Sequence, residues 1–259
     1  GEGSPSKGIN RSQIMTDHLS NNRMKLVKSL HQKKYRDQHG LFMVEGVKLV
    51  GEAIHEGAKI EMIAHACEAN ELPYELPDHS YRVSQKDLER MSALKTPNRI
   101  LAVCEMRPLQ HAKPAGWSLA LDRISDPGNL GTILRICDWF GVNRVLCDPE
   151  TVELYNPKVV QASMGSIFRV GVEYRSLIDF VSENPNLPVY GADMDGESLY
   201  RGDFPAEGIL VMGSEAHGLQ TEIRNRIDRL VSIPKVGGGE SLNVAVSTGI
   251  ILSHLRSRT

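Results

Sequence analysis

In the N-terminal part of the chain, apolar residues recur first at helical spacing and then in short runs. Met24, Val27 and Leu30 are spaced three residues apart, which predicts a helix at the start of this part. The short apolar runs that follow are typical of strands, over residues 41–44, 60–64, 81–83 and 100–104. Amphipathic stretches between them predict helices over residues 45–54 and 84–91. We therefore expect a compact α/β module.

The C-terminal part alternates regularly between apolar runs and amphipathic stretches. The runs predict strands over residues 117–122, 144–147, 168–172, 189–192, 208–212 and 229–233. The amphipathic stretches predict helices over residues 129–140, 157–164, 177–181, 219–227 and 242–255. Such alternation favours an α/β fold with a mostly parallel sheet that is covered by helices on both faces. In sheets of this kind, ligands bind outside the carboxyl ends of the strands.

A segment with few apolar residues and several prolines and glycines, residues 107–116, separates the two parts and predicts a linker. It divides the chain into an N-terminal domain over residues 22–106 and a C-terminal domain over residues 117–259. Residues 1–21 form a predicted tail, which we expect to be disordered or not native to the protein. Its Gly- and Ser-rich start lacks the apolar core of a signal peptide.

Composition narrows the class of protein without choosing a function. Of the 259 residues, 41% are hydrophobic and 24% are charged, which is ordinary for a globular protein. No apolar run reaches the length of about 18 residues that a membrane span requires, so we expect no membrane partner. The four cysteines form no C-x-x-C pair and have no histidine at metal-ligand spacing. We therefore expect reduced thiols, no metal site and a cytoplasmic location.

The net charge of −2 does not indicate a polyanionic partner, but one stretch of the chain is strongly basic. Between residues 21 and 40, Asp37 is the only acidic residue. The basic residues of this stretch are Arg23, Lys25, Lys28, Lys33, Lys34 and Arg36. Such a cluster suits a phosphate backbone, and it is also typical of a solvated helix face. Charge alone leaves both interpretations open.

Three polar segments follow predicted strands of the C-terminal domain, and the first runs from Asp126 to Arg135. Asn129 lies near the start of the following helix, where its amide can cap the helix or hold a neighbouring loop. Arg135 lies six residues further on and projects from a different face of the helix. Taken alone, a cap and a surface cation would explain this segment as well as a binding site would.

The second segment is Gly213-Ser214-Glu215, at the end of a strongly apolar strand. Gly213 leaves its backbone amide and carbonyl open to a ligand. Glu215 can brace a neighbouring loop or cap a helix that starts near Gly218. The Gly-x-Ser-x-Gly pattern of a hydrolase nucleophile is absent, which argues against a serine hydrolase.

The third segment runs from Ile233 to Asn243. Its glycines, residues 237–239, predict a loop whose backbone groups can surround a polar ligand. Ser241 is predicted to cap the last helix, and Asn243 offers both a hydrogen-bond donor and an acceptor. The Gly-x-x-x-x-Gly-Lys-[Ser/Thr] pattern is absent, and no Gly-x-Gly-x-x-Gly follows the first strand. These absences argue against an enzyme that holds a nucleotide on a phosphate loop.

Together, the three segments resemble the motifs of the SpoU (TrmH-like) family of the SPOUT superfamily, which are RNA ribose 2′-O-methyltransferases that use S-adenosylmethionine. Residues 161–168 are similar to the connecting segment of the family, and the resemblance covers residues 117–256. It implies a parallel-sheet SPOUT domain with a deep trefoil knot. The N-terminal domain looks like the RNA-binding domain of many members, which is similar to ribosomal-protein L30e folds.

The resemblance also implies roles for single residues. Backbone groups are expected to hold the cofactor, at Gly213, Ile233 and Leu242, with Ala192 nearby. The catalytic residue is expected to be Arg135. The site around it would be shaped by Asn129, Glu215, Ser241 and Asn243. The RNA would be gripped by basic residues of the N-terminal domain, namely Lys28, Lys33, Lys34 and Arg36. Members of the family are usually homodimers.

The sequence departs from the family pattern at three places. Lys235 replaces a usual apolar residue, residues 237–239 are unusually rich in glycine, and Gly171 replaces a frequent proline. The spacing from Ile233 to Asn243 is intact, so the departures bear on loop geometry rather than on activity. We expect an RNA ribose 2′-O-methyltransferase that acts on ribosomal RNA. A tRNA 2′-O-methyltransferase and a non-catalytic RNA-binding protein are the alternatives.

Overall fold

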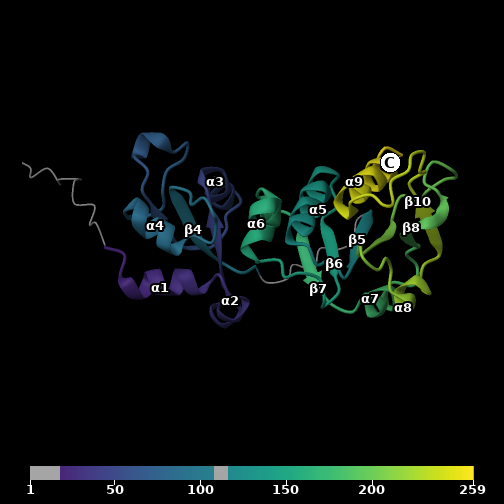
Figure 1. The fold of residues 1–259 in the computed structure, drawn as a ribbon, viewed down its shortest axis with the longest axis horizontal. Coiled ribbons are helices and arrows are strands. Elements are labelled where there is room, and N and C mark those ends of the chain that lie inside the picture. Colours follow the sequence, from purple (N-terminus) through teal and green to yellow (C-terminus); the bar gives the residue numbers. More distant parts are fainter. Residues whose placement is uncertain (1–17, 108–115, 259) are drawn as a thin grey trace, which may run out of the picture.

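The computed structural model describes residues 18–107 and 116–258, which form two sheets side by side in an elongated molecule (Figure 1). The predicted tail and linker lie mostly outside these residues, since 1–17 and 108–115 are not described. Within the described residues, no helix is long and apolar enough to cross a lipid bilayer.

The N-terminal domain is built on a mixed sheet of four strands. Its elements are α1 (Asn21–Ser29), α2 (Lys33–His39), β1 (Leu41–Glu45), α3 (Val47–His55), β2 (Ile60–His65), η1 (Ala69–Glu71), β3 (Ser80–Arg82), α4 (Gln85–Met91) and β4 (Ile100–Glu105). The strand order is β1-β4-β2-β3, with β4 antiparallel to both neighbours and β3 parallel to β2. Apolar side chains of α1 and α4 cover one face, and those of α3 cover the other.

The C-terminal domain is built on a sheet of six strands in the order β10-β8-β9-β5-β6-β7, and every neighbouring pair is parallel. Its strands are β5 (Trp117–Asp122), β6 (Arg144–Cys147), β7 (Gly171–Tyr174), β8 (Val189–Ser198), β9 (Gly208–Gly213) and β10 (Arg229–Ser232). Its helices are α5 (Pro127–Trp139), α6 (Pro157–Ser163), η2 (Ser166–Phe168), α7 (Leu177–Glu183), α8 (Thr221–Arg224) and α9 (Val244–Arg256). The predicted parallel sheet is therefore confirmed.

Helices cover both faces of this sheet, as the alternation predicts. Apolar residues of α5, α6 and α9 pack on one face, and those of α7 and α8 pack on the other. Every residue of the central strand β5 is buried, which explains why four of its six residues are apolar. After β10, at the edge of the sheet, the chain returns to the middle, where α9 packs against α5 (Figure 1). This return brings the three polar segments to the same end of the sheet.

Several predicted element boundaries are wrong. The last helix begins at Val244 and is capped by Asn243, not by Ser241, because the Asn243 Oδ1 atom accepts hydrogen bonds from the amides of Ala245 and Val246 at 2.9 and 3.2 Å. The helix predicted over residues 219–227 is the single turn α8. The strand predicted over residues 168–172 begins only at Gly171, since the turn η2 precedes it.

Candidate active site

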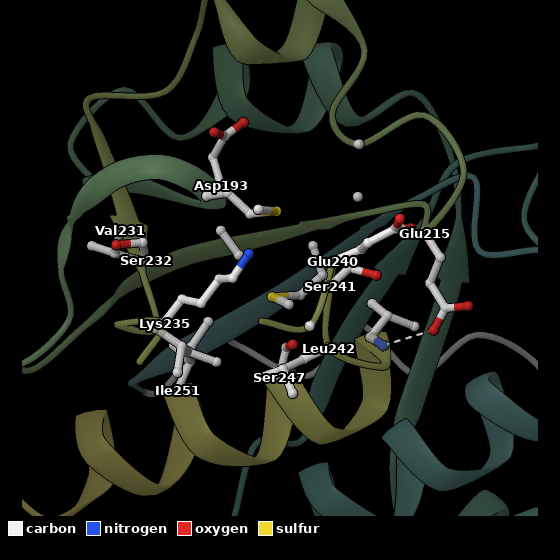
Figure 2. A pocket seen from close by; sticks show the side chains of 18 of the residues that line it. Asp193, Glu215, Val231, Ser232, Lys235, Glu240, Ser241, Leu242, Ser247 and Ile251 are labelled. Atoms are coloured by element: carbon white, nitrogen blue, oxygen red, sulfur yellow. Dashed lines mark hydrogen bonds between the residues drawn. The ribbon is translucent and has the colours of Figure 1, made fainter. Parts of the chain in front are cut away.

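The three polar segments are joined by hydrogen bonds at the start of α9. The Asn243 side chain donates from Nδ2 to Oδ1 of Asn129 at 2.9 Å. The Val244 amide, in the first turn of α9, donates to Oε1 of Glu215 at 2.9 Å (Figure 2). Because these bonds connect residues that are 114 and 29 positions apart, they fix the three segments relative to one another.

The capping of the neighbouring helices explains why the side chains of Asn129 and Glu215 are free to bond other segments. Asp126 caps α5, its Oδ1 atom accepting from the Asn129 amide at 2.8 Å, so the side chain of Asn129 is left to hold the neighbouring loop. Of the two roles open to Asn129, the structure therefore shows the second. Glu215 likewise braces α9 and is no cap for the helix after Gly218, because that helix begins only at Thr221.

A cavity of about 590 Å³ lies beside the middle of β8 and the carboxyl ends of β9 and β10 (Figure 2). The four residues predicted to hold a cofactor all line it: Ala192, Gly213, Ile233 and Leu242. Of the predicted catalytic residues, Glu215 and Ser241 line it as well. Cofactor sites usually enclose roughly 300–1,000 Å³, so the volume suits a nucleoside-sized molecule.

The wall of the cavity at β9 depends on a glycine. A Cβ atom on Gly213 would lie 2.5 Å from the carbonyl carbon of Gly218, which is closer than real contacts allow. The chain turns back between these two glycines, where the amide of Gly218 donates to the carbonyl of Ser214 at 2.8 Å. Gly218 has a φ of +64°, a conformation that side chains rarely adopt. The loop therefore leaves backbone groups exposed to the cavity.

Charged side chains also line the cavity. Three are acids, namely Asp193, Glu215 and Glu240, and Lys235 is the one cation among the described lining residues. Figure 2 shows Lys235 reaching into the cavity from the loop after β10. Asp193 forms an ion pair with Arg224 of α8. A ligand with both positive and negative groups fits this lining better than a polyanion does.

Sequence reasoning missed residues that anchor this end of the sheet. Asp122, the last residue of β5, is 2% exposed and accepts a hydrogen bond from the Gln220 amide at 2.6 Å. Burial raises the pKa of this carboxyl group above its usual value. The next residue, Arg123, has a φ of +57°, and its amide donates to Asp148. A carboxylate at the end of a buried strand was the only signal in the sequence.

Arg135 does not line the cavity. Its side chain is exposed on α5, and no hydrogen bond or ion pair to it is found among the described residues. Nearby, α5 and α9 form an apolar groove that includes Ile136, Val246 and Ile250. Val246 is 52% exposed, and Trp139, at the end of α5, is 85% exposed.

The predicted RNA-binding residues divide into two groups. Lys28, Lys33 and Lys34 are exposed on α1 and α2. The prediction for Arg36 is wrong, because its side chain is buried and donates to Oε2 of Glu153 at 2.6 Å and to two backbone carbonyls. Among the described residues, no group of three or more His, Cys, Asp or Glu side chains is placed to hold a metal ion.

Comparisons with known proteins identify families that the chain resembles. Residues 116–253 match the model of the SpoU rRNA Methylase family, and residues 21–102 match that of the MRM3-like substrate binding domain. The 23S rRNA (guanosine(2553)-2′-O)-methyltransferase RlmP of Bacillus subtilis (strain 168) is 32% identical over 245 residues, which cover 93% of this chain and 98% of that protein.

Solved structures resemble most of the chain. A TrmH-family RNA methyltransferase from Porphyromonas gingivalis is 37% identical with a TM-score of 0.84, covering 93% of this chain and 99% of that one. An AdoMet-bound rRNA methyltransferase from Sinorhizobium meliloti is 30% identical with a TM-score of 0.79, covering 92% and 95%. On the family model and on these relatives, the chain belongs to the SpoU rRNA methylase family.

Proposed function

We propose that the protein transfers a methyl group from S-adenosylmethionine to a ribose 2′-oxygen of ribosomal RNA. The observation that carries the proposal is the joining of Asn129, Glu215 and Asn243 beside a cavity lined by Ala192 and by the other residues expected to hold the cofactor. The named activity of the B. subtilis relative and the AdoMet-bound structure from S. meliloti support the same reaction.

The residues of the cavity fit S-adenosylmethionine. Backbone groups at Gly213, Ile233 and Leu242 would hold it, and apolar lining residues such as Met212 and Ile251 would cover its uncharged parts. The acids of the lining match the positive sulfonium and ammonium groups, and Lys235 matches the carboxylate. When bound, this cofactor supplies a methyl group that is already activated for transfer.

The remaining work of the protein is to place the ribose and to stabilise charge on its oxygen. We assign this role to Arg135, which is exposed and has no partner among the described residues. With a pKa above about 12, an arginine side chain stays charged and is no general base. Arg135 would instead orient the RNA through a phosphate and stabilise the negative charge that develops on the 2′-oxygen. Ser241, exposed in the loop before α9, would contact the same ribose.

We further propose that two copies of the chain associate through α5 and α9. The groove between these helices and the exposed side chains of Trp139 and Val246 form an apolar surface that a second copy would remove from water. The surface adjoins Arg135, so each site would lie near the interface. We also propose that the chain is threaded into a trefoil knot and that the protein is located in the cytoplasm.

Transfer of a labelled methyl group tests the proposed function. The purified protein would be incubated with labelled S-adenosylmethionine and either unmodified ribosomal RNA or unmodified tRNA. A 2′-O-methyl group blocks alkaline cleavage at its own nucleotide, so hydrolysis maps the product. We expect one protected nucleotide in ribosomal RNA. Protection only in tRNA would change the substrate class, and RNA binding without transfer to either RNA would favour the non-catalytic alternative.

A further inference from the structure

The buried arginine of the basic stretch connects the two domains. Arg36 of α2 contacts Glu153, which lies 117 residues further along the chain in the C-terminal domain. The two side chains are 3% and 19% exposed. Both carboxylate oxygens are used, because Oε1 of Glu153 also accepts from the Tyr155 amide at 3.1 Å. A charge pair so well shielded from water tolerates little displacement, since either partner left alone would be a buried charge.

A second bridge joins the domains at Arg169, which follows η2. Its Nη1 atom donates to Oε2 of Glu52 at 2.7 Å and to Oε1 of Glu56 at 3.1 Å, both near the end of α3 in the N-terminal domain. Its Nε atom donates to Oδ2 of Asp138 on α5 at 2.8 Å. The same Asp138 oxygen accepts from the Ser166 hydroxyl at 2.9 Å. One guanidinium group thus holds a helix from each domain.

Aromatic rings from the two domains also pack against each other. Phe42 of β1 lies against Tyr155 and Phe168, with ring centroids 4.6 and 6.4 Å apart. A Cβ atom on Gly165 would lie 2.8 Å from the side chain of Glu52, so the chain approaches α3 closely here. Figure 1 places α2 and α3 on opposite sides of the N-terminal domain. Two bridges on opposite sides of this domain, together with the ring contacts across the interface, oppose rotation of one domain against the other.

The second bridge ends on the helix that carries Asn129 and Arg135. Asp138 lies three residues after Arg135 on α5. The helix itself is fixed against α6, because a Cβ atom on Gly131 would lie 2.4 Å from Cβ of Ala162. The position of α3 in the N-terminal domain is therefore coupled to that of α5 through side chains in direct contact.

We propose that these two bridges, Arg36–Glu153 and Arg169 with Glu52, Glu56 and Asp138, hold the RNA-binding domain at a fixed distance from the methyl donor and so select the nucleotide that is methylated. Arg36 and Arg169 are then positioning residues that determine specificity without touching the RNA or the cofactor. The inference rests on the proposed function, because it assumes that the N-terminal domain binds the substrate RNA.

Two variants break the second bridge from opposite sides: Arg169→Ala, and the double substitution Glu52→Gln with Glu56→Gln. Arg175→Ala is the matched control, because Arg175 bonds Glu183 at 2.6 Å inside the C-terminal domain and is 24% exposed, against 33% for Arg169. Methylated positions would be mapped by alkaline hydrolysis. The distance between spin labels at Glu89→Cys and Glu222→Cys, both exposed sites, would be measured in full-length protein diluted with unlabelled protein. The native cysteines, all buried, would remain unlabelled.

We expect both bridge variants to broaden the distance distribution, to methylate nucleotides beside the wild-type target and to raise KM for RNA about fivefold. The Kd for S-adenosylmethionine should stay within about twofold of wild type, and Arg169→Lys should restore part of the selectivity. Arg175→Ala should keep a single methylated nucleotide. Bridge variants with a wild-type distance distribution and a single methylated nucleotide would overturn the inference. A wild-type protein that methylates no RNA would instead refute the proposed function and the role in selection together, whereas the distances would still show whether the bridges fix the domains.

Discussion

The cofactor cavity and the contact between the domains are held by different parts of the chain. At the cavity, side chains such as Glu215 and Asn243 act by bonding backbone amides, which fixes the path of the loops. Between the domains, the bonds join charged side chains, as in the pair of Arg36 and Glu153. The chemistry therefore depends on the path of the chain, whereas the relation between the domains depends on a few charges. Single substitutions should separate binding, transfer and site selection.

The largest effect is expected for Arg135→Ala. Its loss should lower kcat at least about 100-fold, because the side chain is proposed to stabilise the charge that develops on the 2′-oxygen. The Kd for S-adenosylmethionine should change by less than about tenfold, since the cavity lining is intact. Single-turnover transfer and calorimetric titration measure the two quantities. Loss of cofactor binding or of the fold in this variant would contradict the assignment.

A somewhat smaller effect is expected for Gly213→Ala, which tests the backbone wall. The added Cβ atom would meet the Gly218 backbone at 2.5 Å, and overpacking of this kind costs about 2 kcal/mol, or about 30-fold in the Kd for S-adenosylmethionine. Gly237→Ala is the control, because Gly237 also lines the cavity but has no atom within 4 Å of its Cβ position. Equal losses in both variants would show that the backbone at Gly213 has no special part in the cavity.

Much of the C-terminal fold could be predicted because its physical causes are local. Strands buried on both faces are mostly apolar, as in residues 117–122, where all side chains are buried. The polar segments could be placed at one edge because strands of a parallel sheet end at the same side. The cap of α9 was predicted at the wrong residue, Ser241, since Ser241 and Asn243 both suit a cap. Asn243, the residue that caps α9, also bonds Asn129, which lies 114 residues away in the sequence.

The basic stretch of the N-terminal domain shows where prediction from the sequence fails. Lys33, Lys34 and Arg36 look equivalent in sequence, but Arg36 is 2% exposed. Its partner Glu153 lies in the other domain, so nothing within the stretch distinguishes it from the lysines. Arg36 lies in α2, which contains a single apolar residue, Tyr35, and therefore no apolar periodicity that predicts a separate helix.

An effect on stability rather than on cofactor binding is expected at Asn243, where a side chain bonds the backbone. Asn243→Ala removes the cap of α9 and the bond to Asn129, which together should lower the free energy of unfolding by about 2 kcal/mol. Asn129→Ala removes only the second bond and should cost about 1 kcal/mol. Urea unfolding of both single variants and of the double variant measures the coupling. Fully additive losses would mean that the two side chains do not depend on each other.

The smallest effect is expected for the exposed lysines of α2. Their loss should weaken RNA binding, whereas loss of Arg36 should lower stability. Lys33→Ala with Lys34→Ala should raise KM for RNA about threefold. The dependence of log KM on log salt should fall by about 0.7 for each phosphate that the variant no longer neutralises. The melting temperature should not change, because both side chains are exposed.

Arg36→Ala should instead destabilise the protein by about 3 kcal/mol, because it leaves Glu153 shielded and unpaired. Its salt dependence should stay that of wild type. Lys59→Ala is the control for removal of a surface charge, since that side chain is 81% exposed and lies outside the basic stretch. If the double lysine variant keeps the wild-type salt dependence, α2 does not face the RNA, and the distance that the two bridges fix must be measured from another surface of the N-terminal domain.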